Sequence, residues 1–263
     1  MDTVDATLAT LTADPTRTAL LLDYDGSLAP IVPHPDDAVP LPGTGDVLEA
    51  IAQRIALVGI VSGRPADFLV RAVPARHVAV VGQYGLEWVQ DGEIIVDERA
   101  LPFVGAVAEA ADEAERRWPD LFVERKGTVA VGLHWRNAPE AGDRAIDDID
   151  ALAARLGLEV HPSRMARELR PPLGVDKGNA VERLVAGMST AAFAGDDSGD
   201  LPAFAALERL RSDGRLEQSL RIAVTSPEAP EEVLRNGDLV VDGPEGLRAL
   251  LDALLDALRA ARG

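Results

Sequence analysis

Short apolar runs alternate with amphipathic segments along the first hundred residues of the chain. An unbroken run of apolar and β-branched residues is typical of a buried strand, whereas apolar residues at three- and four-residue intervals are typical of a helix packed on a sheet. The alternation of the two patterns predicts a parallel sheet covered by helices. The predicted strands are 18–24, 56–63 and 77–84, and the predicted helices are 44–54 and 64–73.

The pattern changes after the third predicted strand. Residues 86–96 favour a hairpin that turns at Asp91 and Gly92, a pair suited to the left-handed backbone of a tight turn. From about Leu101 a helical segment and two strand-like segments follow, and this order of elements is then repeated. An αββαββ unit has its own small sheet, so we predict a separate inserted domain. Its elements are helix 102–118, strands 121–127 and 128–137, helix 139–157, and strands 158–163 and 165–171.

Alternating helices and strands resume after Pro171 and Pro172. The predicted fold class is therefore α/β, a doubly wound parallel-sheet (Rossmann-like) core made of residues 1–101 and 172–263. Residues 102–171 are predicted to form an inserted α+β cap of αββαββ type. The returning core elements are helix 176–187, strand 190–197, helix 200–210, strands 220–226 and 238–243, and a leucine-rich helix at 244–262.

Acidic residues gather where the predicted core strands end. Asp23 and Asp25 close the first strand, Ser62 ends the second, and "GDDSGD" at 195–200 ends the strand that follows Lys177. Ligands of doubly wound sheets bind at the carboxyl ends of the strands, so we expect these side chains to lie together. Two acidic clusters at one sheet edge can share a hard cation through oxygen ligands, and we expect Mg²⁺.

These groups are suited to phosphoryl transfer. An aspartate beside a metal ion, a lysine, a hydroxyl group and the loop amides around Gly26 can attack phosphorus and form an aspartyl phosphate. A second carboxyl group is needed to protonate the leaving alkoxide and later to take a proton from water. Lys177 and the metal would neutralise the charge on the transferring oxygens. The predicted chemistry is hydrolysis of a phosphate ester.

Four motifs resemble those of the haloacid dehalogenase superfamily of phosphatases, in the same order along the chain. They are "DYDGS" at 23–27, "VSGR" at 61–64, "VDKG" at 175–178 and "GDDSGD" at 195–200. The resemblance implies that Asp23 is the nucleophile and that Asp25 is the general acid and base. The implied ligands and supports of Mg²⁺ are Asp23, Asp25 through its carbonyl, Asp196, Asp197 and Asp200, and the implied contacts of the substrate's phosphate are Ser62, Lys177, Gly26, Gly63 and Arg64.

Three further stretches resemble the trehalose-6-phosphate phosphatase family more specifically. They are "GQYGLEW" at 82–88, "VERKGTVAVGLHWRNAP" at 123–139 and "RELRPPLGVDKGNAV" at 167–181. The resemblance implies a cap between the second and third motifs, and hydrolysis of trehalose 6-phosphate to trehalose and phosphate, the last step of trehalose biosynthesis. Charged side chains at the cap suit a sugar, because hydroxyl groups form charge-assisted hydrogen bonds with them. The implied substrate-binding residues are Tyr84, Glu124, Lys126, Arg136, Arg164 and Glu168.

Several positions depart from the pattern of that family. Tyr84 stands where the family commonly has histidine, and Arg164 where it often has lysine. Gly199 replaces a usual threonine, and Leu201 and Pro202 replace a usual acidic pair. Because the aspartates of the motifs are present, these differences bear on the identity of the sugar and not on the chemistry.

Charge and composition exclude several classes of binding partner and of chemistry. The formal net charge of −18 argues against nucleic acid and anionic membrane surfaces, which need a dense basic face. The chain has no cysteine, which excludes disulfides, thiolate metal sites and a cysteine nucleophile. The acidic first residues do not resemble a secretory signal. We expect a cytoplasmic enzyme, favour a monomer, and expect a small-molecule sugar phosphate as the partner.

Alternative interpretations stay open at this stage. An isolated pair of aspartates at a strand end more often reaches solvent, and serine or aspartate before a helix is often a simple cap. The joint occurrence of four motifs at one sheet edge disfavours that explanation. Two functional alternatives remain, a phosphatase of another disaccharide or pseudo-disaccharide phosphate and a non-catalytic regulatory module on the same fold. Trp88, Trp118 and Trp135 are interpreted as packing residues, since each lies in an apolar run.

Overall fold

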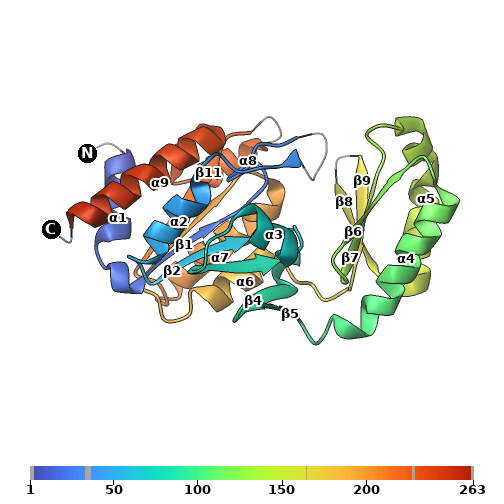
Figure 1. Cartoon of the computed structure of the whole chain (residues 1–263), viewed down its shortest axis with the longest axis horizontal. Helices are drawn as coiled ribbons and strands as arrows, with labels where there is room; N and C mark the ends of the chain where they lie inside the picture. The colour runs from blue at the N-terminus through green and yellow to red at the C-terminus, as the bar shows by residue number, and fades with distance from the viewer. Residues whose placement is uncertain (1–2, 33–36, 164, 227–228, 262–263) are drawn as a thin grey trace. The chain divides into compact units, whose positions relative to one another are not determined.

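The computed structural model describes residues 3–32, 37–163, 165–226 and 229–261. The chain folds as two compact units, the first made of Met1–Gly85 and Val175–Gly263 and the second of Leu86–Gly174 (Figure 1). Within the described ranges, none of the helices combines the length and the apolar character needed to cross a membrane.

A mainly parallel sheet forms the centre of the first unit. The strand β1 (Thr18–Leu22) lies between β10 and β2 and pairs in parallel with both. Every residue of β1 is buried, which explains why its sequence is apolar throughout instead of alternating. The order of the eight-stranded sheet is β12-β11-β10-β1-β2-β3-β4-β5, in which β4 (Glu87–Gln90) and β5 (Glu93–Val96) come from the segment Leu86–Gly174. The other bounds are β2 Leu57–Val61, β3 Val78–Gly82, β10 Thr190–Gly195, β11 Gln218–Val224 and β12 Leu239–Val241.

The order of the strands places a topological switch point between β1 and β10. From β1 the chain proceeds to β2 and β3 on one side, whereas β10, β11 and β12 extend the sheet on the other side. Loops that leave neighbouring strands in opposite directions open a crevice at the carboxyl ends, where doubly wound sheets bind ligands. The segments after Leu22 and Gly195 meet at this crevice. The predicted doubly wound core is confirmed.

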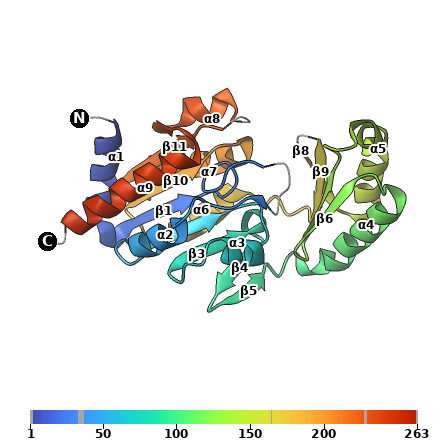
Figure 2. The ribbon, with the colours of Figure 1, turned by 45° about the horizontal axis from the view of Figure 1, so that its top comes forward.

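Helices cover both faces of this sheet (Figure 2). The helices α1, α2 and α9 pack together on one face, and α6 and α7 pack together on the other. Two helices were not predicted from the sequence, α1, which is rich in threonine and buries Leu11, and the six-residue α8. The helix bounds are α1 Thr3–Thr12, α2 Thr44–Ala52, α3 Ala66–Ala72, α6 Lys177–Leu184, α7 Leu201–Ser212, α8 Glu231–Asn236 and α9 Gly243–Ala260.

The predicted hairpin is present as β4 (Glu87–Gln90) and β5 (Glu93–Val96), which pair antiparallel. Asp91 and Gly92 have φ angles of 51° and 82°, so both lie in the left-handed region. Two successive positive φ angles are the backbone of a tight hairpin turn, which favours aspartate and glycine.

The second sheet carries the predicted αββαββ order. Its four antiparallel strands lie in the order β6-β7-β9-β8. The helices α4 and α5 pack on one face through an apolar cluster that includes Leu133, Trp135 and Ile149, while partly buried Trp118 packs against it. The inserted α+β cap is thus confirmed, as is packing for these two tryptophans. The bounds are α4 Val104–Arg117, β6 Phe122–Lys126, β7 Ala130–His134, α5 Pro139–Leu156, β8 Glu159–Ser163 and β9 Ala166–Arg170.

A glycine in the first turn of α5 lets this helix lie against the indole of Trp135. A Cβ atom at Gly142 would lie 1.9 Å from Trp135 Cγ. We expect Gly142→Ala to destabilise this unit by about 1–3 kcal/mol, because the added methyl group must displace a packed ring. Urea unfolding followed by tryptophan fluorescence measures this, since Trp135 belongs to the apolar cluster of the cap and Trp118 packs against it.

The matched control is Gly105→Ala on α4, where a Cβ atom would meet nothing within 4 Å. Alanine is the better helix former, so this variant should be neutral or more stable by about 0.5–1 kcal/mol. Equal effects of the two substitutions would show that contact with Trp135 does not explain the glycine at 142.

Candidate active site

A buried ammonium group lies between two buried carboxylates at the switch point. Lys177 Nζ lies 2.6 Å from Asp23 Oδ1 and 2.6 Å from Asp200 Oδ1. The side chains of Lys177, Asp23 and Asp200 are 4%, 5% and 0% exposed. The backbone N–H of Asp23 donates to the carbonyl of Ala194 at 2.8 Å, which extends the pairing of β1 with β10 beyond the last strand residue. The structure therefore brings together three residues that the sequence predicted at this site.

Lys177 is the first residue of α6, so the start of this helix fixes its position. Asp176 caps the helix, its carboxylate accepting the N–H of Asn179 at 3.0 Å while the Asn179 amide oxygen accepts the N–H of Asp176 at 3.0 Å. Such a capping box fixes the first helical turn. Gly178 lets this turn approach α7, because a Cβ atom there would lie 2.6 Å from the carbonyl oxygen of Pro202.

The loop after β10 folds around the carboxylate of Asp200. Its Oδ2 atom accepts the N–H groups of Asp196 and Asp197 at 2.9 and 3.1 Å, and its Oδ1 atom receives Lys177. Both oxygens of Asp200 are therefore engaged within the protein. Asp197 is exposed and accepts the N–H of Gly199 at 2.8 Å. These two acids shape the loop that presents Asp196.

The carboxylate of Asp196 is the incomplete part of the cluster. Its Oδ1 atom is buried, yet it accepts no hydrogen bond from the residues that the structure describes. One carboxylate oxygen from each of Asp23, Asp196 and Asp200 lies within 4.8 Å of the others. With Lys177 as the ammonium among three carboxylates, two negative charges are unbalanced when all are ionised. An orphaned oxygen and excess negative charge are the features that a divalent cation would satisfy.

Glycine is required where the first loop passes this cluster. Gly26 has a φ angle of 77°, and a Cβ atom there would lie 2.1 Å from Asp196 Oδ2. Its N–H donates to the carbonyl of Ala29 at 2.8 Å, so this amide is used within the loop. A pocket of about 530 Å³ begins beside Gly26. Its other lining residues are Pro30, Ile31, Thr225, Ser226, Asp242, Gly243, Pro244 and Glu245.

Burial changes the proton affinity of the cluster. It raises the pKa of Asp196 to about 7, with a smaller opposing effect from a hydrogen bond to Ser226. Burial, followed by the charge of Asp200, holds the pKa of Asp23 well above its usual range, although Lys177 acts in the opposite direction. Burial alone would lower the pKa of Lys177, but the charges of Asp200 and Asp23 outweigh it and raise that pKa. The ammonium form of Lys177 is thus favoured, and a further cation would favour the ionised carboxylates.

The second motif lies at the end of β2 and contacts the first. Arg64 donates from Nε to Asp25 Oδ2 at 2.7 Å and from Nη2 to Asp25 Oδ1 at 2.6 Å. Ser62 is 2% exposed, and its hydroxyl oxygen accepts the N–H of Arg64 at 3.2 Å. Gly63 admits the ring of Tyr84, since a Cβ atom there would lie 2.5 Å from Tyr84 Cζ. Tyr84 itself has a φ angle of 59°, and its N–H donates to the carbonyl of Ser62 at 2.9 Å.

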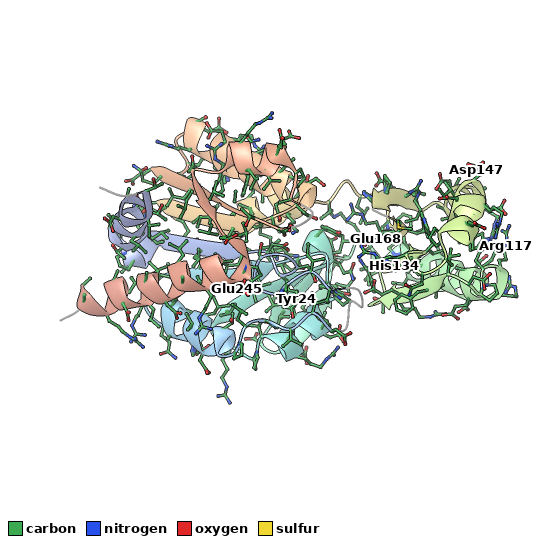
Figure 3. The ribbon with its side chains drawn as sticks, turned by 90° about the horizontal axis from the view of Figure 1, so that it is seen from above. Tyr24, Arg117, His134, Asp147, Glu168 and Glu245 are labelled. Carbon is green, nitrogen blue, oxygen red and sulfur yellow. The ribbon has the colours of Figure 1, made fainter. Side chains whose placement is uncertain are left out.

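Three of the predicted sugar-binding residues, Glu124, Lys126 and Glu168, share the face of the cap sheet opposite α4 and α5. Figure 3 shows Glu168 and His134 on the side of this unit away from Arg117 of α4 and Asp147 of α5. Lys126 Nζ donates to Glu168 Oε2 at 2.6 Å, and these side chains are 14% and 10% exposed. Glu124 Oε2 lies 2.9 Å from His134 Nε2.

Two of the predicted cap residues lie elsewhere. The strand predicted to reach residue 137 ends at His134, so Arg136 is exposed in the turn that follows. Arg164 lies outside the described residues.

Sequence reasoning missed polar residues on the same face of the cap. Arg170 Nη1 lies 3.8 Å from Glu168 Oε1, and Arg170 Nη2 lies 2.6 Å from His161 Nδ1. Glu168 Oε1 is buried and accepts no hydrogen bond from the described residues. The signal was the two-residue period of strands, which places Arg170 beside Glu168 and places His134 on the face of Glu124 through the register of β6 with β7.

A doubly wound core with acidic residues on both sides of its switch point, interrupted by an antiparallel cap sheet, defines a haloacid-dehalogenase-like protein. Residues 21–234 match the family model of trehalose-phosphatase. The chain therefore belongs to the trehalose-phosphatase family.

Individual relatives agree with this assignment. The chain is 33% identical over 259 residues to a bifunctional trehalose-6-phosphate synthase/phosphatase of Thermoproteus tenax, covering 90% of this chain and 32% of that protein. It is 30% identical over 233 residues to a trehalose-phosphate phosphatase of Mycobacterium marinum, covering 80% and 59%. The chain thus spans less than two thirds of the length of these curated relatives. A crystal structure of a trehalose-6-phosphate phosphatase related protein matches with a TM-score of 0.77 and 25% identity, covering 93% of this chain and 100% of that one.

The raised pKa of Asp196 predicts how stability depends on pH without metal. At pH values between 3.8, the ordinary pKa of aspartate, and about 7, Asp196 keeps a proton in the folded protein that it releases in the unfolded chain. The free energy of unfolding should therefore fall as the pH rises through this window and level off above it. Urea unfolding in a chelator at about pH 5 and about pH 8 measures the loss.

Asp196→Asn is the control, because its neutral amide does not titrate. This variant should lose less stability between the two pH values than the wild type. His161, whose pKa is lowered by burial, contributes a slope of opposite sign in both proteins and cancels in the comparison. An equal loss in the variant would exclude Asp196 as the source.

Proposed function

We propose that the chain is a Mg²⁺-dependent phosphatase that hydrolyses trehalose 6-phosphate to trehalose and phosphate, the last step of trehalose biosynthesis. The observation that carries the proposal is the buried Asp23 at the switch point, with Lys177 on one oxygen and the carboxylate of Asp196, whose Oδ1 atom accepts no hydrogen bond from the described residues, in the same cluster. Membership of the trehalose-phosphatase family supports the substrate. A cytoplasmic location and a monomeric state stay predictions.

In the first half of the proposed reaction, a carboxylate oxygen of Asp23 attacks phosphorus. The bond between phosphorus and the sugar oxygen breaks, Asp25 gives its proton to the leaving alkoxide, and an aspartyl phosphate remains. Lys177 and Ser62 hold the phosphoryl oxygens, for which their positions beside Asp23 and at the end of β2 are suited. Gly63, next to Ser62, belongs to the same proposed phosphate site.

In the second half, water attacks the phosphorus of the aspartyl phosphate. Asp25 takes a proton from this water, and the bond between phosphorus and the Asp23 oxygen breaks to release inorganic phosphate. The enzyme returns to its starting state because Asp25 regains the proton that it gave to the sugar. The two carboxyl groups of the first motif therefore have different roles.

The proposed ligands of Mg²⁺ are the carboxylates of Asp23 and Asp196 and the carbonyl of Asp25. When bound, the ion supplies positive charge to the transferring phosphoryl oxygens. Asp197 and Asp200 are proposed to support this site by shaping the loop, since Asp200 is committed to Lys177 and to two backbone N–H groups.

The polar face of the cap sheet is proposed to bind the sugar. We keep 102–171 as the proposed cap domain. Glu124, Lys126 and Glu168 lie on one face and offer charged donors and acceptors, which bind hydroxyl groups through charge-assisted hydrogen bonds. Arg136, in the turn after β7, and Tyr84, in the first unit, stay proposed substrate-binding residues.

A panel of phosphate esters tests metal, reaction and substrate together. With Mg²⁺ and trehalose 6-phosphate we expect the highest kcat/KM, lower values for other disaccharide and monosaccharide phosphates, and little activity after chelation. Mg²⁺ should also raise the melting temperature of the wild type and not that of Asp196→Asn, because binding to the folded state alone stabilises it. A better substrate in the panel would replace trehalose 6-phosphate, and absence of phosphate release from every ester would favour a regulatory module.

The leaving group tests the role of Asp25. Asp25→Asn should lower kcat on trehalose 6-phosphate by about 10²–10⁴-fold, because the alkoxide needs a proton. On 4-nitrophenyl phosphate, whose leaving group departs without a proton, the loss should be much smaller. Steady-state kinetics on both esters provides the comparison, and Asp67→Asn on the exposed face of α3 serves as the control. Equal losses on both substrates would remove Asp25 from the acid role.

A further inference from the structure

The guanidinium group of Arg64 donates hydrogen bonds to both carboxylate oxygens of Asp25. The two donor distances of 2.7 and 2.6 Å form a parallel pair of bonds from the planar fork. The Arg64 side chain is 10% exposed and that of Asp25 is 37% exposed. Such a pair fixes the plane of the carboxylate as well as its position, which a single ammonium contact does not do.

The guanidinium group of Arg64 packs over the ring of Phe68, which in turn contacts Tyr24. Its central carbon lies 4.7 Å from the centroid of the Phe68 ring, a cation–π arrangement. The Phe68 ring meets Tyr24 edge to face, with centroids 5.5 Å apart and an interplanar angle of 88°. The Tyr24 hydroxyl donates to the carbonyl of Ala38 at 2.6 Å. Tyr24 lies between the two aspartates of the first motif, so one stack connects that motif with Arg64.

The backbone of Arg64 is also fixed. Its N–H donates to Ser62 Oγ at 3.2 Å, and its carbonyl accepts the N–H of Gln83 at 3.0 Å. Arg64 therefore has a defined place between the ends of β2 and β3, and Asp25 takes its orientation from that place. The sequence resemblance had implied that Arg64 contacts the substrate, whereas its Nε and Nη2 atoms bond to Asp25 in the structure.

We propose that Arg64 is a positioning residue that orients Asp25 for proton transfer to the leaving group. This inference rests on the proposed phosphatase function. Because both oxygens of Asp25 accept bonds from Arg64, the planar fork fixes both the position and the plane of the carboxylate.

The test compares Arg64→Gln and Arg64→Lys with the wild type on trehalose 6-phosphate and 4-nitrophenyl phosphate. Arg64→Gln should lower kcat on the sugar phosphate by about 10- to 100-fold, a loss typical of a misplaced catalytic group, with little effect on the nitrophenyl ester. Arg64→Lys keeps the charge and loses the fork, so its loss should be intermediate. KM and inhibition by inorganic phosphate should not change.

Two further variants sharpen the comparison. The double variant Arg64→Gln with Asp25→Asn should be no slower on trehalose 6-phosphate than Asp25→Asn alone, because both changes remove the same function. Arg221→Lys is the matched control, since Arg221 forms a similar two-bond pair with Asp238 at 3.0 and 2.8 Å on a different part of the first unit. It should leave kcat on both substrates unchanged. If Arg64→Gln does not fold, Phe68→Leu removes the supporting ring and should give a smaller loss with the same selectivity.

Equal losses on both esters, with weaker inhibition by inorganic phosphate, would overturn the proposal and place Arg64 on the phosphate. Failure of the phosphatase function itself would show separately, as a wild type that hydrolyses none of the esters. In that case a double-mutant cycle of urea unfolding still reports on the pair, with an expected coupling of at least about twofold in the unfolding constant. Absence of coupling would overturn the placement of Arg64 on Asp25.

Discussion

The buried ammonium of Lys177 ties together segments that are far apart in the sequence. It bonds at 2.6 Å to Asp23 after β1 and to Asp200 in the loop after β10, and it is itself the first residue of α6. A charge buried without a partner costs several kcal/mol, so each of these groups is tolerated only because the others are present. The relative placement of β1, α6 and the loop after β10 therefore depends on this contact.

The cluster of Lys177 with Asp23, Asp196 and Asp200 carries more negative than positive charge when its carboxyl groups are ionised. Asp200 uses both oxygens, yet Asp196 Oδ1 is buried without a hydrogen bond from the described residues. An unsatisfied buried polar atom costs about 1–3 kcal/mol, a cost that folding alone does not explain. The same arrangement gives a cation a prepared oxygen at the switch point of the sheet. The unsatisfied Oδ1 atom of Asp196 thus lowers the stability of the metal-free protein, and the same atom is available to a cation.

The sequence predicted the parts of this structure that depend on local pattern. The apolar strands, the turn at Asp91 and Gly92 and the edge that gathers Asp23 and Asp196 all follow from periodicity and topology. The threonine-rich helix α1 did not, because packing against α9 outweighs its weak propensity. The partner of Arg64 could not be predicted either, since a motif gives the order of residues and no side-chain direction.

The two basic residues of the core site differ in a way that matches the carboxylates they hold. Lys177 offers a compact charge that bonds to Asp23 and Asp200 together. Arg64 offers a planar fork, which suits one carboxylate whose orientation matters. In a chain where only Lys126 and Lys177 among 26 basic residues are lysine, both lysines lie against largely buried carboxylates. The choice of cation therefore follows the geometry of each contact, and the one-residue gap between Asp23 and Asp25 separates two carboxylates with different electrostatic partners.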